Sequence, residues 1–286
     1  MAVEITARKV VKKLAYGQQT LDKPSTSSFC FAWWVKVPWS RIGGFGLIAT
    51  LLILWEASAR LGWIESRTWP PFTSVVSASV ERVISGEMPA IFASSLKLMF
   101  VGYTIGCTVG IIVGLLFGLW RTGYWFANPI FELFRPIPTP AIIPPLILFL
   151  GVDGALKATI ISLATFFPAY INTLGGVRSV SDVILQTAST FRLGRWARLT
   201  KVILPSALPA IMSGLRINIG LALVVTIISE MISGSSGVGY FIVQTQYAMR
   251  PEYVYTAVIG LGIVGYALNR VAVYIERKLV FWHSSG

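Results

Sequence analysis

The sequence predicts an all-α membrane protein with six transmembrane helices. Three observations lead to this fold class. Of the 286 residues, 55% are hydrophobic and only 13% are charged, with a mean hydropathy of +0.70, whereas soluble domains average about 25% charged residues. The chain also contains six mainly apolar stretches of the roughly 20 residues that a spanning helix requires. No strand-like alternation and no internal repeat is found in it.

The six apolar stretches define the expected spans in chain order. The second carries no charge in 23 residues. The third has five prolines between residues 136 and 145, so we expect it to start as an extended segment or a kinked helix. The expected spans are residues 42–61, 98–120, 131–150, 158–177, 210–232 and 253–279.

The regions outside the spans set the domain organisation and the orientation. Residues 1–41 form a basic tail with an interfacial aromatic stretch, residues 42–282 form the transmembrane domain, and residues 283–286 form a short tail. If the N-terminus lies in the cytoplasm, 18 of the 24 Lys and Arg residues fall on the inside. Because cytoplasmic loops carry the excess of basic residues, both termini are expected to be cytoplasmic.

Three shorter features lie within or between the spans. A short helix is expected at 74–84, and the sequence GSSGVGY at 234–240 predicts a turn followed by a short helix. Span two carries glycines at a spacing of four, which places them in one stripe along the helix. Small residues at this spacing allow two helix backbones to approach closely, so the stripe predicts a helix–helix contact. Its members are Gly102, Gly106, Gly110, Gly114 and Gly118.

Several function classes are excluded by composition and motifs. The net charge of +12 would suit a nucleic-acid ligand only on a soluble polar surface, and this chain has too little polar sequence to form one. It contains no P-loop, no H-E-x-x-H, no G-x-S-x-G and no Cys/His cluster, so neither a nucleotide site nor a hydrolytic or metal site is expected.

The loop between spans four and five, residues 178–209, is the most informative segment. Cations recur every three residues along it, which predicts a helix with one basic flank from Asp182 to Lys201, N-capped by Ser181 or Asp182. Pro205 and Pro209 are expected to end that helix. A positive-inside loop that only sets topology would explain the charges, but it explains neither the length of the loop nor the paired Leu-Pro.

The stretch ILQTASTFRLGRWARLTKVILPSALPAIMSGLRINIGLA resembles the EAA loop of ABC importer permeases. Its glutamate and alanine positions read Gln186, Thr187 and Ala188. The position of the family glycine reads Arg192, with Gly194 two residues later. Two further stretches, IFELFRPIPTPAIIPPLILFLG and ISEMISGSSGVGYFI, are similar to the nitrate/sulfonate/taurine (bicarbonate) group of these permeases, and the resemblance extends over residues 90–282.

The resemblance implies a type I (MetI-like) importer architecture with a cytoplasmic coupling helix between spans four and five. It implies a bacterial inner-membrane permease that pairs with a second permease subunit, most simply a copy of itself, inside the lipid bilayer. Two cytosolic ATPases, which carry the ATP and Mg, and an extracytoplasmic substrate-binding protein complete the transporter, and no cofactor and no nucleic acid is expected on this chain. The expected cargo is a small anion such as a sulfonate, nitrate, bicarbonate or similar organic acid. The expected coupling residues are Gln186, Ala188, Arg192, Gly194, Arg195, Leu204 and Pro205.

Polar residues within the spans are the candidates for the pathway. Glu56 and Glu132 stand one helical turn from Arg60 and Arg135, which favours local ion pairs or capping. Glu230 has no basic neighbour within a turn of its own helix, so we expect it either to act in outer gating or to cap a neighbouring helix N-terminus. Three residues on one face of span five are expected to line the pathway together with Glu230: Asn218, Thr226 and Ser229.

An ion-coupled secondary transporter is the alternative reading. Such folds usually carry inverted repeats and broken helices near the midplane. Glu230 is the one acid that the sequence offers for ion coupling within the spans.

Overall fold

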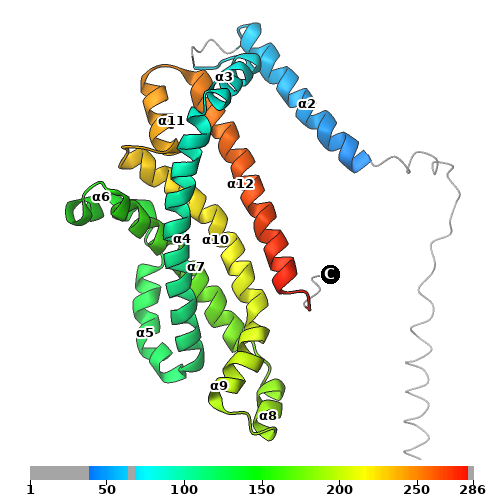
Figure 1. The fold of residues 1–286 in the computed structure, drawn as a ribbon, viewed down its shortest axis with the longest axis vertical. Helices are drawn as coiled ribbons and strands as arrows, with labels where there is room; N and C mark the ends of the chain where they lie inside the picture. The colour runs from blue at the N-terminus through cyan, green and yellow to red at the C-terminus, as the bar shows by residue number, and fades with distance from the viewer. Residues whose placement is uncertain (1–38, 64–67, 283–286) are drawn as a thin grey trace, which may run out of the picture. The chain divides into compact units, whose positions relative to one another are not determined.

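The computed structural model describes residues 39–63 and 68–282, with the backbone alone described at residues 39–43 and 45. The described residues divide into two units, one that ends at Ile53 and one that begins at Leu54. Every described element is helical (Figure 1). The predicted basic tail lies outside the described residues as far as residue 38, and the predicted C-terminal tail lies entirely outside them.

Four helices among the described residues are long and apolar enough to cross a membrane. They are α4 (Glu87–Leu119), α7 (Gly154–Arg178), the continuous helix Arg195–Ile232, most of which is α10 (Leu204–Ile232), and α12 (Pro251–Leu279). These helices contain the expected spans four, five and six, and span two up to its last residue, Trp120, which follows the end of α4. The first expected span falls on α2 (Trp39–Arg60), whose first side chains lie outside the described set, so the total of six stays a prediction.

The third expected span is a bent pair of helices. α5 (Arg121–Phe134) begins well before the expected boundary at residue 131, so that boundary is wrong, and α6 (Thr139–Leu150) follows at an angle of 92°. The break at residues 135–138 contains two prolines, which lack the N–H that a continuing helix needs and disfavour a helical residue before them. Figure 1 shows α6 turning across the direction of α5. The expected irregular segment is therefore confirmed, but it divides the span in its middle.

The glycine stripe of α4 packs against α7, as the sequence predicts. A Cβ atom added at Gly110 would lie 2.6 Å from the carbonyl oxygen of Phe166, and one added at Gly114 would lie 2.8 Å from that of Tyr170. The hydroxyl of Ser162 on α7 donates to the carbonyl of Gly102 at 3.0 Å. The two helices thus come close enough for a serine hydroxyl of α7 to reach the backbone of α4, and a side chain larger than hydrogen on the stripe would overlap α7.

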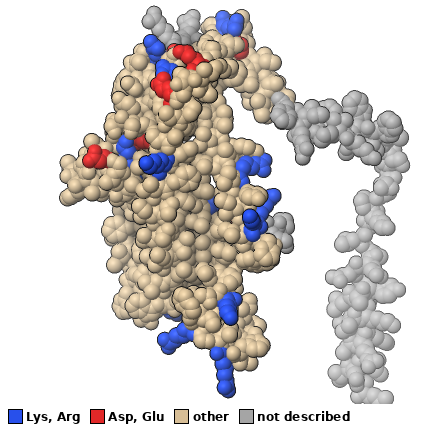
Figure 2. Space-filling view, viewed as in Figure 1, with Lys and Arg blue, Asp and Glu red and all other residues tan. Residues whose placement is uncertain are grey.

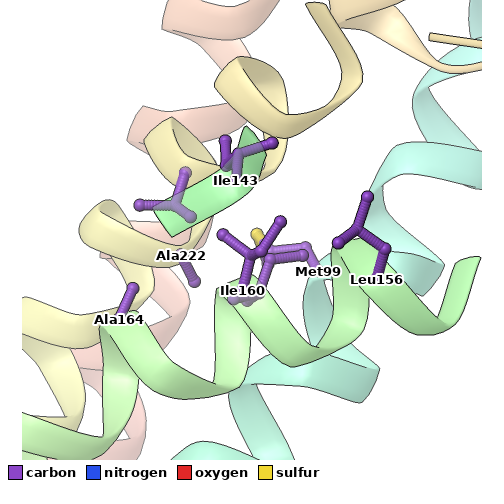
Figure 3. Packing of buried hydrophobic residues seen from close by; sticks show 8 residues of the cluster. Met99, Ile143, Leu156, Ile160, Ala164 and Ala222 are labelled. Carbon is purple, nitrogen blue, oxygen red and sulfur yellow. The ribbon is translucent and has the colours of Figure 1, made fainter. Parts of the chain in front are cut away.

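A buried apolar cluster joins α4, α6, α7 and α10 (Figure 3). None of its members is more than 6% exposed. Contacts of this density stabilise helix association in lipid, where there is no water to expel. The cluster therefore holds α6 against α7 and α10 and fixes the bend of the helix pair. Its members are Met99, Ile143, Leu156, Ile160, Ile161, Ala164, Ala222 and Val225.

Two short helices flank the spans where the sequence places them. α3 (Phe72–Ile84) matches the helix expected at 74–84, and α11 (Val238–Tyr247) follows the GSSGVGY turn. Both pack against α12, and they contribute to a second buried cluster with Met88 and Tyr253.

The carboxylates of two spans have local partners. Glu56 pairs with Arg60 at 2.5 Å, which confirms the expected ion pair, and it also accepts the backbone N–H of Thr73 in the first turn of α3 at 3.0 Å. Glu132 accepts a hydrogen bond from the Asn128 amide at 2.7 Å. The ion pairs of the described residues do not include Glu132 with Arg135, so the expectation of that pair is wrong.

Candidate functional site: the coupling loop and the buried face of α10

The loop between α7 and α10 starts with a short helix rather than one long basic helix. α8 (Asp182–Thr190) begins after Ser181, whose hydroxyl accepts the N–H of Val183 at 3.3 Å. The expected N-cap is therefore confirmed. The expectation that this helix continues to Lys201 is wrong, because α8 ends at Thr190 and the chain turns before α9 (Arg195–Arg198).

Arg192 makes this turn with a left-handed backbone. Its φ is +53°, a conformation that favours glycine. The N–H of Arg192 bonds to the carbonyl of Ser189 at 2.9 Å, and the N–H of Leu193 bonds to the carbonyl of Ala188 at 3.1 Å. This pair of bonds is the Schellman motif that commonly ends helices at glycine. The turn is thus built without the glycine that the EAA-loop pattern has at this position.

The helix that follows the turn does not end at the Leu-Pro pairs, which corrects a second expectation. α9 continues through a π-helical segment, η1 (Leu199–Ile203), into α10, and the N–H of Leu204 bonds back five residues to Leu199. The widened turn lies directly before Pro205, where an ordinary α-helix would bring the proline ring against the carbonyl of Lys201. The chain therefore continues as one helix from Arg195 to Ile232, 38 residues long.

The end of the molecule formed by α8 and α9 presents aromatic and basic side chains to its surroundings. Phe191 and Trp196 are 75% and 76% exposed, and Figure 2 shows basic side chains at the end where Figure 1 places α8 and α9. We call the exposed residues here the coupling surface. Of the other expected coupling residues, Ala188 is buried, and Leu204 and Pro205 are half-buried. The coupling surface consists of Gln186, Phe191, Arg192, Gly194, Arg195 and Trp196.

The expected pathway face of α10 lies inside the chain in this conformation. Asn218, Thr226 and Ser229 are 0% exposed and Glu230 is 1% exposed. The Asn218 amide donates to the carbonyl of Thr165 on α7 at 2.8 Å. The hydroxyls of Thr226 and Ser229 donate to carbonyls of their own helix, at 2.7 and 2.8 Å. These internal hydrogen bonds offset the cost of burying the donor groups, while the Oδ1 atom of Asn218 is buried without a hydrogen-bond partner among the described residues. The part of these residues in the pathway stays a prediction.

Glu230 stands at the N-terminus of α11. One carboxylate oxygen accepts the N–H of Gly239 at 2.9 Å and the hydroxyl of Ser95 at 3.0 Å, while that hydroxyl accepts the N–H of Val238 at 2.9 Å. A carboxylate in this place meets the free N–H groups and the positive end of the helix dipole. This geometry matches the capping role, one of the two roles expected for Glu230. Gly237, which has a φ of +100°, leaves room for the carboxylate, since an added Cβ would overlap it.

Lys157 is the residue of this cluster that sequence reasoning missed. It lies in the first turns of α7, is only 3% exposed and interacts electrostatically with Glu230. The sequence interpretation began span four at Ala158 and left Lys157 in the outer loop. The signal that could have found it is a single cation inside an otherwise apolar helix, because such residues are rare in spans without a partner.

A cavity of about 400 Å³ lies where α5 and α6 break. Arg135, Thr139 and Asn172 contribute its polar side chains, and apolar residues of α5, the break, α6, α7 and α10 form the rest of the wall. Arg135 is the charged residue of this lining. Irregular backbone within a membrane is stable where it is buried in protein or lines a water-filled cavity. The cavity therefore provides the surroundings in which the break between α5 and α6 is stable.

Known proteins are similar to this chain in sequence and in fold. Residues 106–281 match the family model of the binding-protein-dependent transport system inner membrane component. The chain is 34% identical over 85% of its length to the aliphatic sulfonates transport permease protein SsuC of Escherichia coli, covering 92% of that protein, and 30% identical over 85% to SsuC of Bacillus subtilis, covering 88%. The fold resembles a chain of the inward-facing MetNI methionine ABC transporter with a TM-score of 0.60 and 18% identity, over 67% of this chain and 97% of that chain.

The family match extends over the bent helix pair, the loop between α7 and α10, and α10 to α12. The family is a membrane subunit of ABC importers, which act with a separate ATPase and a binding protein. The protein is therefore a multi-pass permease of the inner membrane and not an enzyme. This chain belongs to the family of binding-protein-dependent transport system inner membrane components.

Proposed function

We propose that this chain pairs with a second copy of itself to form the pathway of an ATP-driven importer for a small anion, of which an aliphatic sulfonate is the first choice. Nitrate, bicarbonate and similar organic acids are the other members of the class. The proposal includes two cytosolic ATPases, which hold ATP and Mg, and a substrate-binding protein on the outer side. Both chain termini lie in the cytoplasm. The names of the relatives from Escherichia coli and Bacillus subtilis support the sulfonate.

The coupling surface is the observation that carries this proposal. Exposed aromatic residues such as Phe191 and Trp196 are typical anchors of a protein interface, and the adjacent arginines suit an acidic partner surface. The helix that begins at Arg195 runs without interruption to Ile232, ~57 Å at 1.5 Å per residue. Movement of an ATPase against the coupling surface would therefore be transmitted along α10 to Glu230 and the N-terminus of α11. We infer that Glu230 controls the opening of the pathway on the outer side, because it holds α11 to α10 and α4.

The cavity at the break between α5 and α6 is the proposed contact for the transported anion. Arg135 supplies the positive charge, and Thr139 and Asn172 supply neutral hydrogen-bonding groups. Broken helices often form substrate sites in transporters, because they free backbone groups within the membrane. A sulfonate suits this lining, since the guanidinium group binds oxyanions with well-directed hydrogen bonds.

Transport by the reconstituted complex tests the function. The chain is placed in proteoliposomes with its ATPase and binding protein, and uptake of methanesulfonate is measured with ATP inside and without an ion gradient. We expect ATP to drive uptake. Uptake driven by a proton or sodium gradient in the absence of ATP would establish the ion-coupled alternative instead.

The anion contact is tested by replacing, one at a time, the arginines at the two ends of α5. Arg135→Gln is expected to reduce sulfonate uptake at least tenfold, while the ATPase activity of the complex is retained. Arg121→Gln is the control, because Arg121 is an exposed arginine at the other end of α5, away from the cavity. Equal uptake by the two variants would remove Arg135 from the pathway.

A further inference from the structure

A deep groove separates α10 and α12 near α8, and the proposed importer function gives it no role. Its volume is about 1120 Å³. Four basic side chains line it, Lys201, Arg216, Arg270 and Arg277, against one acidic side chain, Glu276. The lining is therefore strongly positive.

The contacts within the groove leave most of this charge uncompensated. Arg216 reaches Glu276 at 3.5 Å and donates to the amide oxygen of Asn269 at 3.3 Å. Arg270 donates to the hydroxyl of Tyr266 at 2.8 Å, with its guanidinium 5.1 Å from the centre of the same ring. These neutral partners orient Arg270 without cancelling its charge. One carboxylate faces four cations, and the groove retains an excess of positive charge.

The groove continues along the same two helices as an apolar channel. A second cavity of about 390 Å³ shares Ser213, Arg216 and Asn269 with the first. Its other walls are apolar side chains, with Gly220 on α10 and Gly265 on α12. An atom added at Gly220 would meet nothing within 4 Å, so this glycine leaves the channel open. The apolar side chains are Ile217, Ile219, Leu223 and Leu268.

We propose that this groove binds an anionic phospholipid, with the phosphate among the basic residues and one acyl chain along the apolar channel. Basic pockets between spanning helices on the cytoplasmic side suit anionic headgroups, and the cytoplasmic leaflet carries these lipids. In the orientation proposed above, α8 and the basic end of the groove lie on that side.

The shape of the groove distinguishes a lipid from the transported anion. A small hydrophilic anion gains nothing from an apolar channel that continues from its binding site. An acyl chain meets apolar walls there and stays out of water, as it does in the bilayer. The juxtaposition of a four-cation site and a connected apolar channel is what a molecule with a charged head and an apolar tail requires.

Lipid retention by the purified chain tests the proposal, and it does not depend on transport. The full-length protein is incorporated into nanodiscs of equal parts phosphatidylglycerol and phosphatidylcholine, and the lipids that remain bound on release are counted by native mass spectrometry. We expect phosphatidylglycerol to be retained in preference to phosphatidylcholine. Arg277→Gln should reduce its retention about fivefold. Lys278→Gln should leave retention unchanged, because the neighbouring Lys278 is exposed but does not line the groove.

A second variant tests the tail of the lipid independently of charge. Gly220→Leu places a side chain into the open channel and should reduce phosphatidylglycerol retention about as much as Arg277→Gln, while thermal stability stays at the parent value. Equal retention by Arg277→Gln and Lys278→Gln would overturn the lipid site. Displacement of the lipid by millimolar inorganic phosphate or methanesulfonate would also overturn it and would assign the groove to a free anion.

Discussion

The carboxylate of Glu230, two residues from the end of α10, lies 2.9 Å from the backbone nitrogen of Gly239 in the first turn of α11. The same carboxylate accepts the hydroxyl of Ser95 on α4 at 3.0 Å. Three helices are thus joined through one buried side chain. The helix that ends in α10 begins at the coupling surface. A movement of that surface in the proposed mechanism would therefore act on this junction, at the other end of the same helix.

Ser95→Ala is expected to lower the free energy of unfolding by about 1–3 kcal/mol. The substitution removes the donor to Glu230 and leaves the N–H of Val238 without its acceptor, and buried polar groups left unpaired cost about this much. Thermal unfolding of the purified protein measures the effect. Ser94→Ala is the matched control, because the exposed Ser94 bonds only to the carbonyl of Ile91 in its own helix. Equal unfolding temperatures for the two variants would contradict the junction.

Glu230→Gln is expected to change coupling without preventing assembly. The amide keeps an oxygen that accepts the N–H of Gly239, but it lacks the negative charge that favours the N-terminus of α11 and attracts Lys157. In the reconstituted complex, ATP hydrolysis should be retained while substrate uptake changes. If hydrolysis and uptake both match the parent, and cysteine probes at positions 218, 226 and 229 stay inaccessible in every nucleotide state, neither gating nor pathway lining by this face is correct.

Gly110→Leu is expected to separate α4 from α7. Even a Cβ at this position would lie 2.6 Å from the carbonyl oxygen of Phe166 and 2.8 Å from the Cβ of Ala169, so the two backbones must move apart. Overpacking of this kind costs about 1–3 kcal/mol or more, which thermal unfolding and the yield of assembled complex will reveal. Thr108→Leu provides the comparison, because Thr108 lies on the exposed side of the same helix. Equal stability of both variants would show that the stripe is not a close contact.

Arg192→Gly is expected to stabilise the end of α8 by about 1 kcal/mol, since a left-handed conformation costs a residue with a Cβ atom about 1–2 kcal/mol. Hydrogen exchange of the amides of Arg192 and Leu193 reports this local stability. Arg192→Ala removes the same charge but keeps the Cβ, so it should give no gain. Stabilisation by both variants would mean that charge, and not the φ of +53°, determines the energy of the turn.

Trp196→Ala is expected to weaken binding of the ATPase at least tenfold and to leave the stability of the chain unchanged, because the side chain is 76% exposed and interface aromatics commonly contribute 2 kcal/mol or more. Tyr247→Ala is the control, since Tyr247 is 82% exposed on α11. Cysteine pairs between positions 186–196 and the ATPase should also cross-link. Efficient cross-links that map only to the N-terminal tail would refute the coupling surface.

The sequence by itself determined the features that depend on a single helix. Composition and length identified the apolar helices, the spacing of the glycines identified the contacting stripe, and Ser181 identified the start of α8. The loop between α7 and α10 could be proposed as the coupling loop because its Leu-Pro pairs and cations are adjacent in the chain. Each of these signals lies within about one helix length, where local propensity and periodicity act.

The tertiary structure decided which helices meet and which polar groups are shared. Ser95 and Glu230 are 135 residues apart in the chain, and Lys157, which interacts electrostatically with Glu230, lies on α7. No periodicity within one span could indicate that these residues belong together. Packing also turned the expected pathway face of α10 inward, bent the α5–α6 pair by 92° and carried the helix past Pro205 through a π turn. The physical reason is common to all of these outcomes. A polar or irregular segment in a membrane is stable only where another helix or a cavity receives it, and that partner is chosen by the packing of the whole bundle.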